Sequence, residues 1–161
     1  MIQKQMRAAL SAAAGVIAFD QLTKYLVVER MDLRTVGEVA VMPGVLFRMV
    51  WNRGVNFGIL SGDSSSTRWI LAIGTTLIAV ALLWSARKSA RTSTAVGLGI
   101  AAGGAIGNAI DRVHWGAVAD FLNVSCCGIR NPWSFNVADI AIFVGLGVVM
   151  WTTRRGEGVK R

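Results

Sequence analysis

Four apolar segments separated by polar loops constrain this chain more than any other feature. They cover residues 8–28, 69–86, 95–113 and 137–153. Each has about the length that an α-helix needs to cross the hydrocarbon core of a bilayer. The composition agrees, because 53% of the residues are hydrophobic and 16% are charged, against roughly 25% charged in soluble proteins. We therefore expect one integral-membrane domain, residues 1–161, with four transmembrane helices.

The positions of the basic residues predict how this domain is oriented. Nine of the 17 Lys and Arg residues lie before the first apolar segment, between the second and third, or after the fourth. Basic residues concentrate on the cytoplasmic side of membrane proteins. Both termini are therefore expected in the cytoplasm, and the long loops 29–68 and 114–136 outside. The net charge of +8 is then explained by the basic residues on the cytoplasmic side of the membrane. No nucleic-acid partner is expected, because no basic cluster with stacking aromatics is present.

The two long loops contain candidate strands. Val39–Met42 and Val45–Trp51 flank Pro43–Gly44, a pattern that predicts a β-hairpin. Asp120–Val124 in the second long loop is a further candidate strand. The third apolar segment is rich in glycine and alanine, which allows helices to approach one another closely in lipid. The expected fold is mainly α, with a small extracytoplasmic sheet over a helical bundle.

Polar residues inside the apolar segments are informative, because a bilayer tolerates few of them. Asp20 and Lys24 are four residues apart and share one helix face. They form either a neutralised structural pair or part of a proton relay. Asn108 lies one turn before Asp111 and Arg112, at the outer end of the third segment. An acid–arginine pair at a helix end is typical of an interface anchor, whereas an inward Arg112 would bind a carbonyl or carboxylate.

Two further acids, Asp120 and Asp139, lie on either side of the boundary between the second long loop and the fourth segment. If the third and fourth segments pack together, the two carboxylates can meet at the same depth. Two close carboxylates cannot both ionise cheaply, so one keeps a proton and the other acts as a base on water. The alternative is a pair of unrelated interfacial acids, and the spacing alone leaves both interpretations open.

The sequence has few histidine and cysteine side chains that could bind a metal. His114 is the single histidine, and the two cysteines, Cys126 and Cys127, are adjacent. This excludes a histidine-rich metal site and a disulfide framework. A pair of carboxylates that activates water needs no metal and no cofactor, so none is expected.

Five blocks of this sequence resemble the lipoprotein signal peptidase family, the type II signal peptidases of bacteria. The blocks are Asp20–Lys24, Asn52–Gly58, Gly103–Arg112, Gly116–Phe121 and Phe135–Asp139. The resemblance implies that Asp120 and Asp139 are the catalytic pair of an aspartic endopeptidase. It further implies that a set of polar and small residues lines the site and binds the substrate, with Asp20 and Lys24 in support. That set is Asn52, Gly54, Asn108, Arg112 and Asn136.

The resemblance also implies a substrate and a location. The substrate would be a prolipoprotein, diacylglyceryl-modified on a cysteine and cut just before that cysteine. Membrane lipids and cyclic-peptide inhibitors of the globomycin type would be further partners. The enzyme would lie in the bacterial cytoplasmic (inner) membrane with its active site near the outer face. The first outer loop would form a β-cradle with a short interfacial helix.

Some residues depart from the family pattern, and other functions stay open. Asn56, Trp133–Ser134 and Cys126–Cys127 differ from what the family usually has at these places. The main alternative is a small proton- or ion-coupled transporter that uses Asp20, Lys24 and Asp139 as its path. An assembly factor without catalysis and a peptidase that uses serine and lysine are weaker alternatives.

Overall fold

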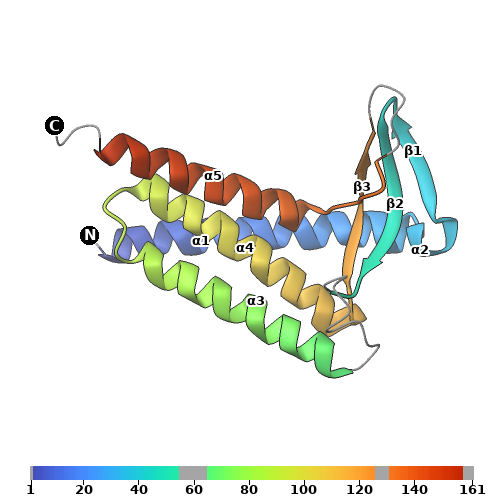
Figure 1. The fold of residues 1–161 in the computed structure, drawn as a ribbon, viewed down its shortest axis with the longest axis horizontal. Helices are drawn as coiled ribbons and strands as arrows, with labels where there is room; N and C mark the ends of the chain where they lie inside the picture. Colours follow the sequence, from blue (N-terminus) through green and yellow to red (C-terminus); the bar gives the residue numbers. More distant parts are fainter. Residues whose placement is uncertain (1, 55–64, 126–130, 158–161) are drawn as a thin grey trace.

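The computed structural model describes residues 2–54, 65–125 and 131–157. Long helices run side by side and a small sheet lies across one end of them, opposite to both chain termini (Figure 1). The helices are α1 (Ile2–Lys24), α3 (Ser65–Ala86), α4 (Thr92–Trp115) and α5 (Val137–Glu157), and a π-helix over Tyr25–Arg30 continues α1. The departures noted at Asn56 and Cys126–Cys127 lie outside the described residues.

Helix α4 is the centre of the bundle and packs against α1, α3 and α5. Its glycines make this packing possible. A Cβ atom on Gly99 would lie 2.2 Å from the carbonyl oxygen of Ala9 in α1, and one on Gly104 would lie 2.4 Å from that of Ala138 in α5. Both distances are far below van der Waals contact, so neither neighbouring backbone could stay where it is. The expectation that this segment allows close helix contacts is confirmed.

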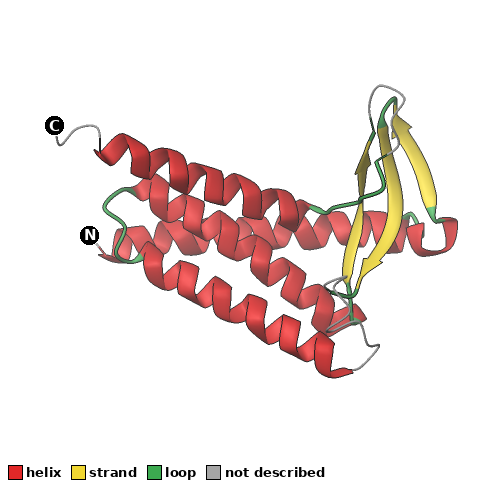
Figure 2. Cartoon of the chain, viewed as in Figure 1, coloured by secondary structure: helices red, strands yellow, loops and turns green. Residues whose placement is uncertain are grey.

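The sheet is antiparallel and has the strand order β1 (Glu38–Met42), β2 (Val45–Asn52) and β3 (Val118–Val124). The predicted hairpin is confirmed, with Gly44 at a φ of 81° in its turn. The predicted strand in the second long loop is β3, which begins two residues earlier than expected. A one-turn helix, α2 (Leu33–Val36), precedes β1 (Figure 2).

The sheet is attached to the bundle by a hydrophobic cluster. Val27 and Val28 of the π-helix pack with Leu33 and with Phe121 of β3, and all four are buried. The rings of Phe47 in β2 and Phe121 meet edge to face, with centroids 5.6 Å apart. This cluster packs β3, and with it Asp120, against the end of the first helix. Backbone hydrogen bonds between Leu122 and Phe135 then join β3 to the segment that leads into α5.

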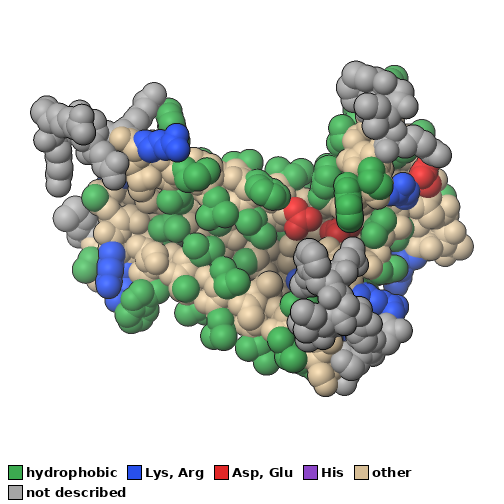
Figure 3. Space-filling view, viewed as in Figure 1, with side chains coloured by type: hydrophobic (Ala, Val, Ile, Leu, Met, Phe, Trp, Pro, Cys, Tyr) green, Lys and Arg blue, Asp and Glu red, His purple; other side chains and the backbone are tan. Residues whose placement is uncertain are grey.

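Three helices of the described chain are long and apolar enough to cross a membrane. They are Ser66–Ala86, Thr92–Trp115 and Val137–Arg154. The predicted fourth span over residues 8–28 is helical, as α1 and the π-helix that follows it, but it is not confirmed as a span, because α1 is not among the described helices that are apolar enough to cross. Hydrophobic side chains cover the visible faces of the helices, and Lys and Arg gather toward the two ends (Figure 3).

Candidate active site

Asp120 points from β3 into the space between the sheet and the first turn of α5. It is 3% exposed. Two side-chain amides bind its carboxyl group: Asn52 Nδ2 donates to Oδ2 at 3.2 Å, and Asn136 Nδ2 donates to Oδ1 at 2.6 Å. These amides come from β2 and from the residue before α5, so three separate segments converge on one carboxyl group.

The surroundings of Asp120 favour its protonated form. Burial raises the pKa of Asp120 to about 7, and the negative charge of Asp139 acts in the same direction. The hydrogen bonds from Asn52 and Asn136 oppose this shift and are smaller in effect. At pH 7 Asp120 therefore still holds its proton in a large share of the molecules, whereas an ordinary aspartate would have lost it.

Asp139 lies in the first turn of α5, in a reciprocal arrangement with Asn136. Asn136 Oδ1 accepts the backbone N–H of Asp139 at 2.9 Å, and Asp139 Oδ2 accepts that of Asn136 at 3.3 Å. This is the geometry of a helix capping box, here built from Asn and Asp. The other oxygen of Asp139 accepts the amide of Asn108 at 2.8 Å. The carboxylate orientation is thus determined through both of its oxygens.

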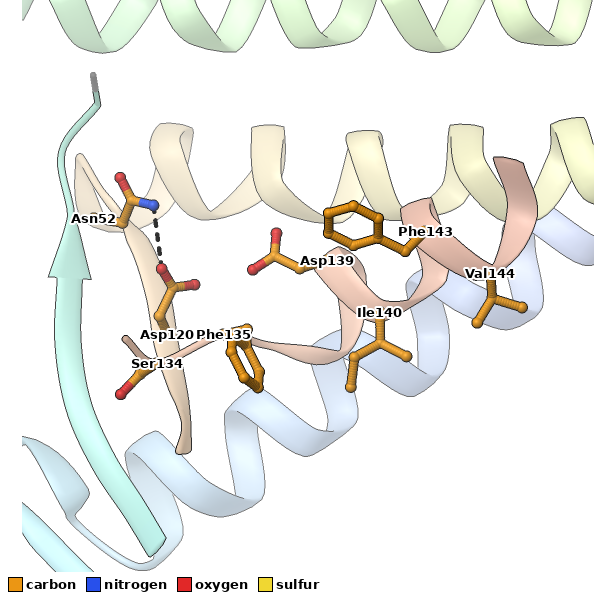
Figure 4. A pocket seen from close by; sticks show the side chains of 8 residues that line it. All are labelled: Asn52, Asp120, Ser134, Phe135, Asp139, Ile140, Phe143 and Val144. Carbon is orange, nitrogen blue, oxygen red and sulfur yellow. Dashed lines mark hydrogen bonds between the residues drawn. The ribbon is translucent and has the colours of Figure 1, made fainter. Parts of the chain in front are cut away.

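Both aspartates line one cavity of about 380 Å³ (Figure 4). In this view the carboxyl groups of Asp120 and Asp139 point toward one another, with Asn52 beside Asp120. The rest of the lining is mostly apolar and comes from α5 and the chain just before it. The lining residues are Asn52, Asp120, Ser134, Phe135, Asp139, Ile140, Phe143 and Val144. A water or a peptide carbonyl that entered this cavity would meet both acids.

Gly54 and Arg112, two further predicted residues, support the amides of the site. The N–H of Gly54 donates to Asn52 Oδ1 at 3.2 Å, which leaves the Asn52 amide nitrogen for Asp120. Gly54 has a φ of 127°, a backbone conformation that other residues rarely adopt. Arg112 donates to the backbone oxygen of Asn108 at 3.2 Å, and its charge interacts with Asp120 and Asp139.

Asp20 and Lys24 form an ion pair of 2.8 Å and are fully buried. The structure adds a partner that the sequence did not predict: Asp111 lies 2.7 Å from Lys24 and is also fully buried. The interpretation of Asp111 as an interface anchor is therefore wrong. Asp111 faces α1 rather than the membrane surface, because α4 turns it toward the same neighbours as Asn108, three residues earlier. The spacing of three residues between Asn108 and Asp111 puts both on one face of α4, and this spacing was the sequence signal that could have identified Asp111 as a buried residue.

Comparison with known proteins identifies the family. The sequence profile of signal peptidase (SPase) II matches residues 12–155. The chain belongs to the signal peptidase II family. Relatives named lipoprotein signal peptidase include those of Methylobacterium sp. (strain 4-46), 37% identical over 94% of both chains, and of Rhodopseudomonas palustris (strain ATCC BAA-98 / CGA009), 37% identical over 91% of this chain and 93% of the relative.

The fold of this signal peptidase II member is also similar to solved structures of bacterial membrane enzymes. A bacterial membrane enzyme solved at 2.3 Å resolution by the in meso method has a TM-score of 0.74 and 29% sequence identity. The alignment covers 95% of this chain and 91% of that one. Membership in the family makes the chain a protease, and the paired aspartates are consistent with the aspartic type. It also decides between the peptidase and the transporter, in favour of the peptidase.

Proposed function

We propose that this protein is a lipoprotein signal peptidase that cuts diacylglyceryl-modified prolipoproteins just before the lipidated cysteine. The observation that carries the proposal is the convergence of Asp120 and Asp139 on one cavity. The substrate class follows from the names of the relatives, which match more than nine-tenths of the chain. In this proposal the reaction is hydrolysis of a peptide bond by a pair of carboxyl groups.

The two acids take different roles because their surroundings differ. Asp120 is buried and keeps its proton, so it donates a hydrogen bond to the oxygen of the scissile carbonyl. The proposal gives the role of base to Asp139, whose carboxyl group is oriented by hydrogen bonds from Asn108 and Asn136, and which takes a proton from the attacking water. The resulting tetrahedral intermediate collapses as the proton on Asp139 passes to the leaving nitrogen.

The amides Asn52, Asn108 and Asn136 orient the acids without changing protonation state themselves. Asn136 contacts both acids, because its side chain donates to Asp120 and its backbone N–H donates to Asp139. We therefore assign it the role of keeping the two carboxyl groups at a working distance. The positive charge of Arg112 reduces the repulsion between the acids when both are ionised.

The apolar part of the cavity is proposed to receive the lipid part of the substrate. Ile140, Phe143 and Val144 follow Asp139 along α5 and line the same cavity. They are exposed in the protein alone, with Phe143 at 79%. An acyl chain of the modified cysteine would cover them while the scissile bond lies at the aspartates. Membrane lipids would cover the remaining exposed face, and cyclic peptides of the globomycin type would occupy the same cavity as inhibitors.

We further propose that α1 and its π-helical continuation are the fourth span, within a single membrane domain of residues 1–161. The charged pair Asp20 and Lys24 is turned inward and fully buried. Leu10, Phe19 and Leu22 are exposed on the outside of the helix, as a lipid-facing surface requires. With the distribution of basic residues, four spans put both termini in the cytoplasm and the aspartates near the outer face of the inner membrane.

Reporter fusions test this orientation. Fusions truncated after Arg91 or Arg154 are expected to give a cytoplasmic signal, and fusions truncated after Met42 or Asn131 an extracytoplasmic signal. The basic residues between α3 and α4 and after α5 are the reason. Each position is fused both to a reporter that fluoresces only in the cytoplasm and to a phosphatase that is active only in the periplasm. Every position then gives a positive signal with one of the two reporters. A cytoplasmic signal at Met42 would contradict the proposed orientation.

Cleavage by the purified protein is the direct test of the function. A diacylglyceryl-modified precursor is incubated with the enzyme in detergent, and the products are identified by mass spectrometry. We expect a new amino terminus at the lipidated cysteine. A well-folded preparation that leaves the precursor intact, or cuts it elsewhere, would refute the function.

The rate of cleavage is expected to fall on both sides of a pH optimum. The proposed mechanism needs Asp120 protonated, and its pKa is raised to about 7. As pH rises above that value the proton is lost, so kcat/KM should fall about tenfold for each further pH unit. Protonation of the base gives the acid limb, and both limbs report the pair as a unit. The pH profile of kcat/KM checks this, and a constant rate from pH 6 to 9 would contradict it.

A further inference from the structure

A buried ammonium group lies between two carboxylates that are not part of the proposed catalytic pair. Lys24 Nζ is 2.8 Å from Asp20 Oδ2 and 2.7 Å from Asp111 Oδ2. All three side chains are fully buried. Gln21 joins the acids a second time, because its amide nitrogen donates to both at 3.1 Å. Such a cluster is stable only while each charge keeps its partner, because an isolated charge in the bundle is costly.

Each acid of this cluster also accepts one backbone N–H, and the two N–H groups occupy equivalent positions. Asp20 Oδ1 accepts from Ala138 at 2.9 Å, and Asp111 Oδ2 accepts from Ala119 at 3.2 Å. Ala138 is the residue before Asp139, and Ala119 is the residue before Asp120. The cluster therefore binds the backbone of α5 and that of β3 at the points where the two acids emerge.

We propose that Asp20, Lys24 and Asp111 are a positioning triad that sets the separation between Asp120 and Asp139. This inference rests on the proposed function. The triad lies behind the cavity and binds the backbone rather than the reacting atoms, so its members are positioning residues. One ammonium joins the anchor of α5 to the anchor of β3. A change in either ion pair therefore alters the gap in which water and the scissile carbonyl must fit.

A third contact connects the triad to the site through a side chain. Lys24 Nζ lies 3.5 Å from Asn108 Oδ1, and the amide nitrogen of Asn108 donates to Asp139 at 2.8 Å. Asp139 is thus positioned both from its backbone and from its carboxylate. Both connections begin at Lys24: one passes through Asp20 to the backbone before Asp139, and the other passes through Asn108 to the Asp139 carboxylate. This double connection gives the fully buried ammonium a role.

Two variants of Asp111 separate its hydrogen bond to the backbone of β3 from its negative charge. Asp111→Ala removes the acceptor for the Ala119 N–H, whereas Asp111→Asn keeps a carbonyl oxygen that can accept it. We expect Asp111→Ala to lower kcat on the lipidated precursor at least tenfold, with KM within about threefold of wild type. Asp111→Asn should be at least fivefold faster than Asp111→Ala. Rates are normalised to the monodisperse protein recovered by size exclusion.

Gly107 offers a second test that removes no polar group, in case Asp111→Ala does not fold. A Cβ atom on Gly107 would lie 2.6 Å from Asp20 Oδ2, so Gly107→Ala pushes this carboxylate away from its place. We expect kcat to fall several-fold. The matched control is Gly147→Ala in α5, where a Cβ atom would meet nothing within 4 Å. The control should keep the wild-type kcat.

The outcomes distinguish this inference from the function on which it rests. A wild-type enzyme that does not cleave the precursor would overturn the proposed function. A wild-type enzyme that cleaves, beside Asp111→Ala and Gly107→Ala variants with unchanged kcat per folded protein, would overturn the triad alone. Lower thermal stability with unchanged kcat would mean that the three residues serve folding only. An Asp111→Asn variant as slow as Asp111→Ala would likewise contradict positioning through the Ala119 N–H.

Discussion

Asp120→Asn and Asp139→Asn are each expected to lose cleavage of a lipidated precursor by about 10³-fold. Asparagine keeps the size of the side chain but can neither donate the acid proton nor take one from water. General acid–base groups contribute about 10²- to 10⁴-fold to enzymatic rates. The mechanism uses both acids in one step, so either substitution removes most of that contribution. Initial rates with equal amounts of folded protein measure the loss.

The double variant is expected to lose little more than either single one. Residues that act as a unit have strongly non-additive effects, because the first substitution already disables the unit. Independent roles would instead multiply the two losses. Cleavage by Asp120→Asn, Asp139→Asn and the double variant, measured side by side, distinguishes these cases.

Asp32→Asn is the matched control for the loss of one carboxylate. Asp32 lies before α2 with a φ of 49°, where asparagine is also well tolerated, and its carboxylate accepts from the Thr35 hydroxyl at 3.0 Å. An asparagine oxygen can accept the same hydrogen bond, so this variant should keep full activity. Full activity in Asp120→Asn or Asp139→Asn, with the protein folded and inserted, would refute the aspartic mechanism.

The elements of the fold that local chemistry specifies could be predicted from the sequence. Pro43–Gly44 between two β-rich runs predicted the hairpin, and the long apolar runs predicted α3, α4 and α5. The glycines of α4 predicted close packing, which Gly99 and Gly104 display. These features depend on neighbours within a few residues along the chain, where spacing and side-chain type carry the information.

The arrangement of the site depends on contacts between distant segments, which spacing does not contain. Asp120 has a raised pKa because β3 packs into the interior and Asp139 lies opposite, and neither fact is local. Asp111 was misjudged for the same reason: its partner Lys24 is on another helix, 87 positions away. The resemblance to the peptidase family named the candidate acids, but the raised pKa of Asp120 follows from its three-dimensional surroundings.

The form of the substrate should have the second largest effect on the rate. We expect the diacylglyceryl-modified precursor to be cut about 10²-fold faster, in kcat/KM, than the same precursor without lipid. Both forms lie in detergent or lipid, so burial of apolar area is not the main source of the difference. The acyl chains instead restrict where the scissile bond can lie relative to Asp120 and Asp139, and positioning of this kind accelerates reactions strongly. Equal rates on both forms would refute the lipoprotein substrate and leave the protease assignment intact.

Phe143 links this preference to the cavity. It lines the site one turn beyond Asp139 and is 79% exposed, so an acyl chain that reaches the aspartates would contact it. Phe143→Ala should reduce the ratio of the two rates several-fold, mainly by slowing the lipidated precursor, because the unlipidated form has no chain to place there. The matched control is Leu77→Ala on α3, which removes another strongly exposed apolar side chain, 63% exposed and not among the cavity residues. An equal loss in both variants would assign the effect to contact with the surrounding detergent, and the acyl chain would then have to bind elsewhere than along α5.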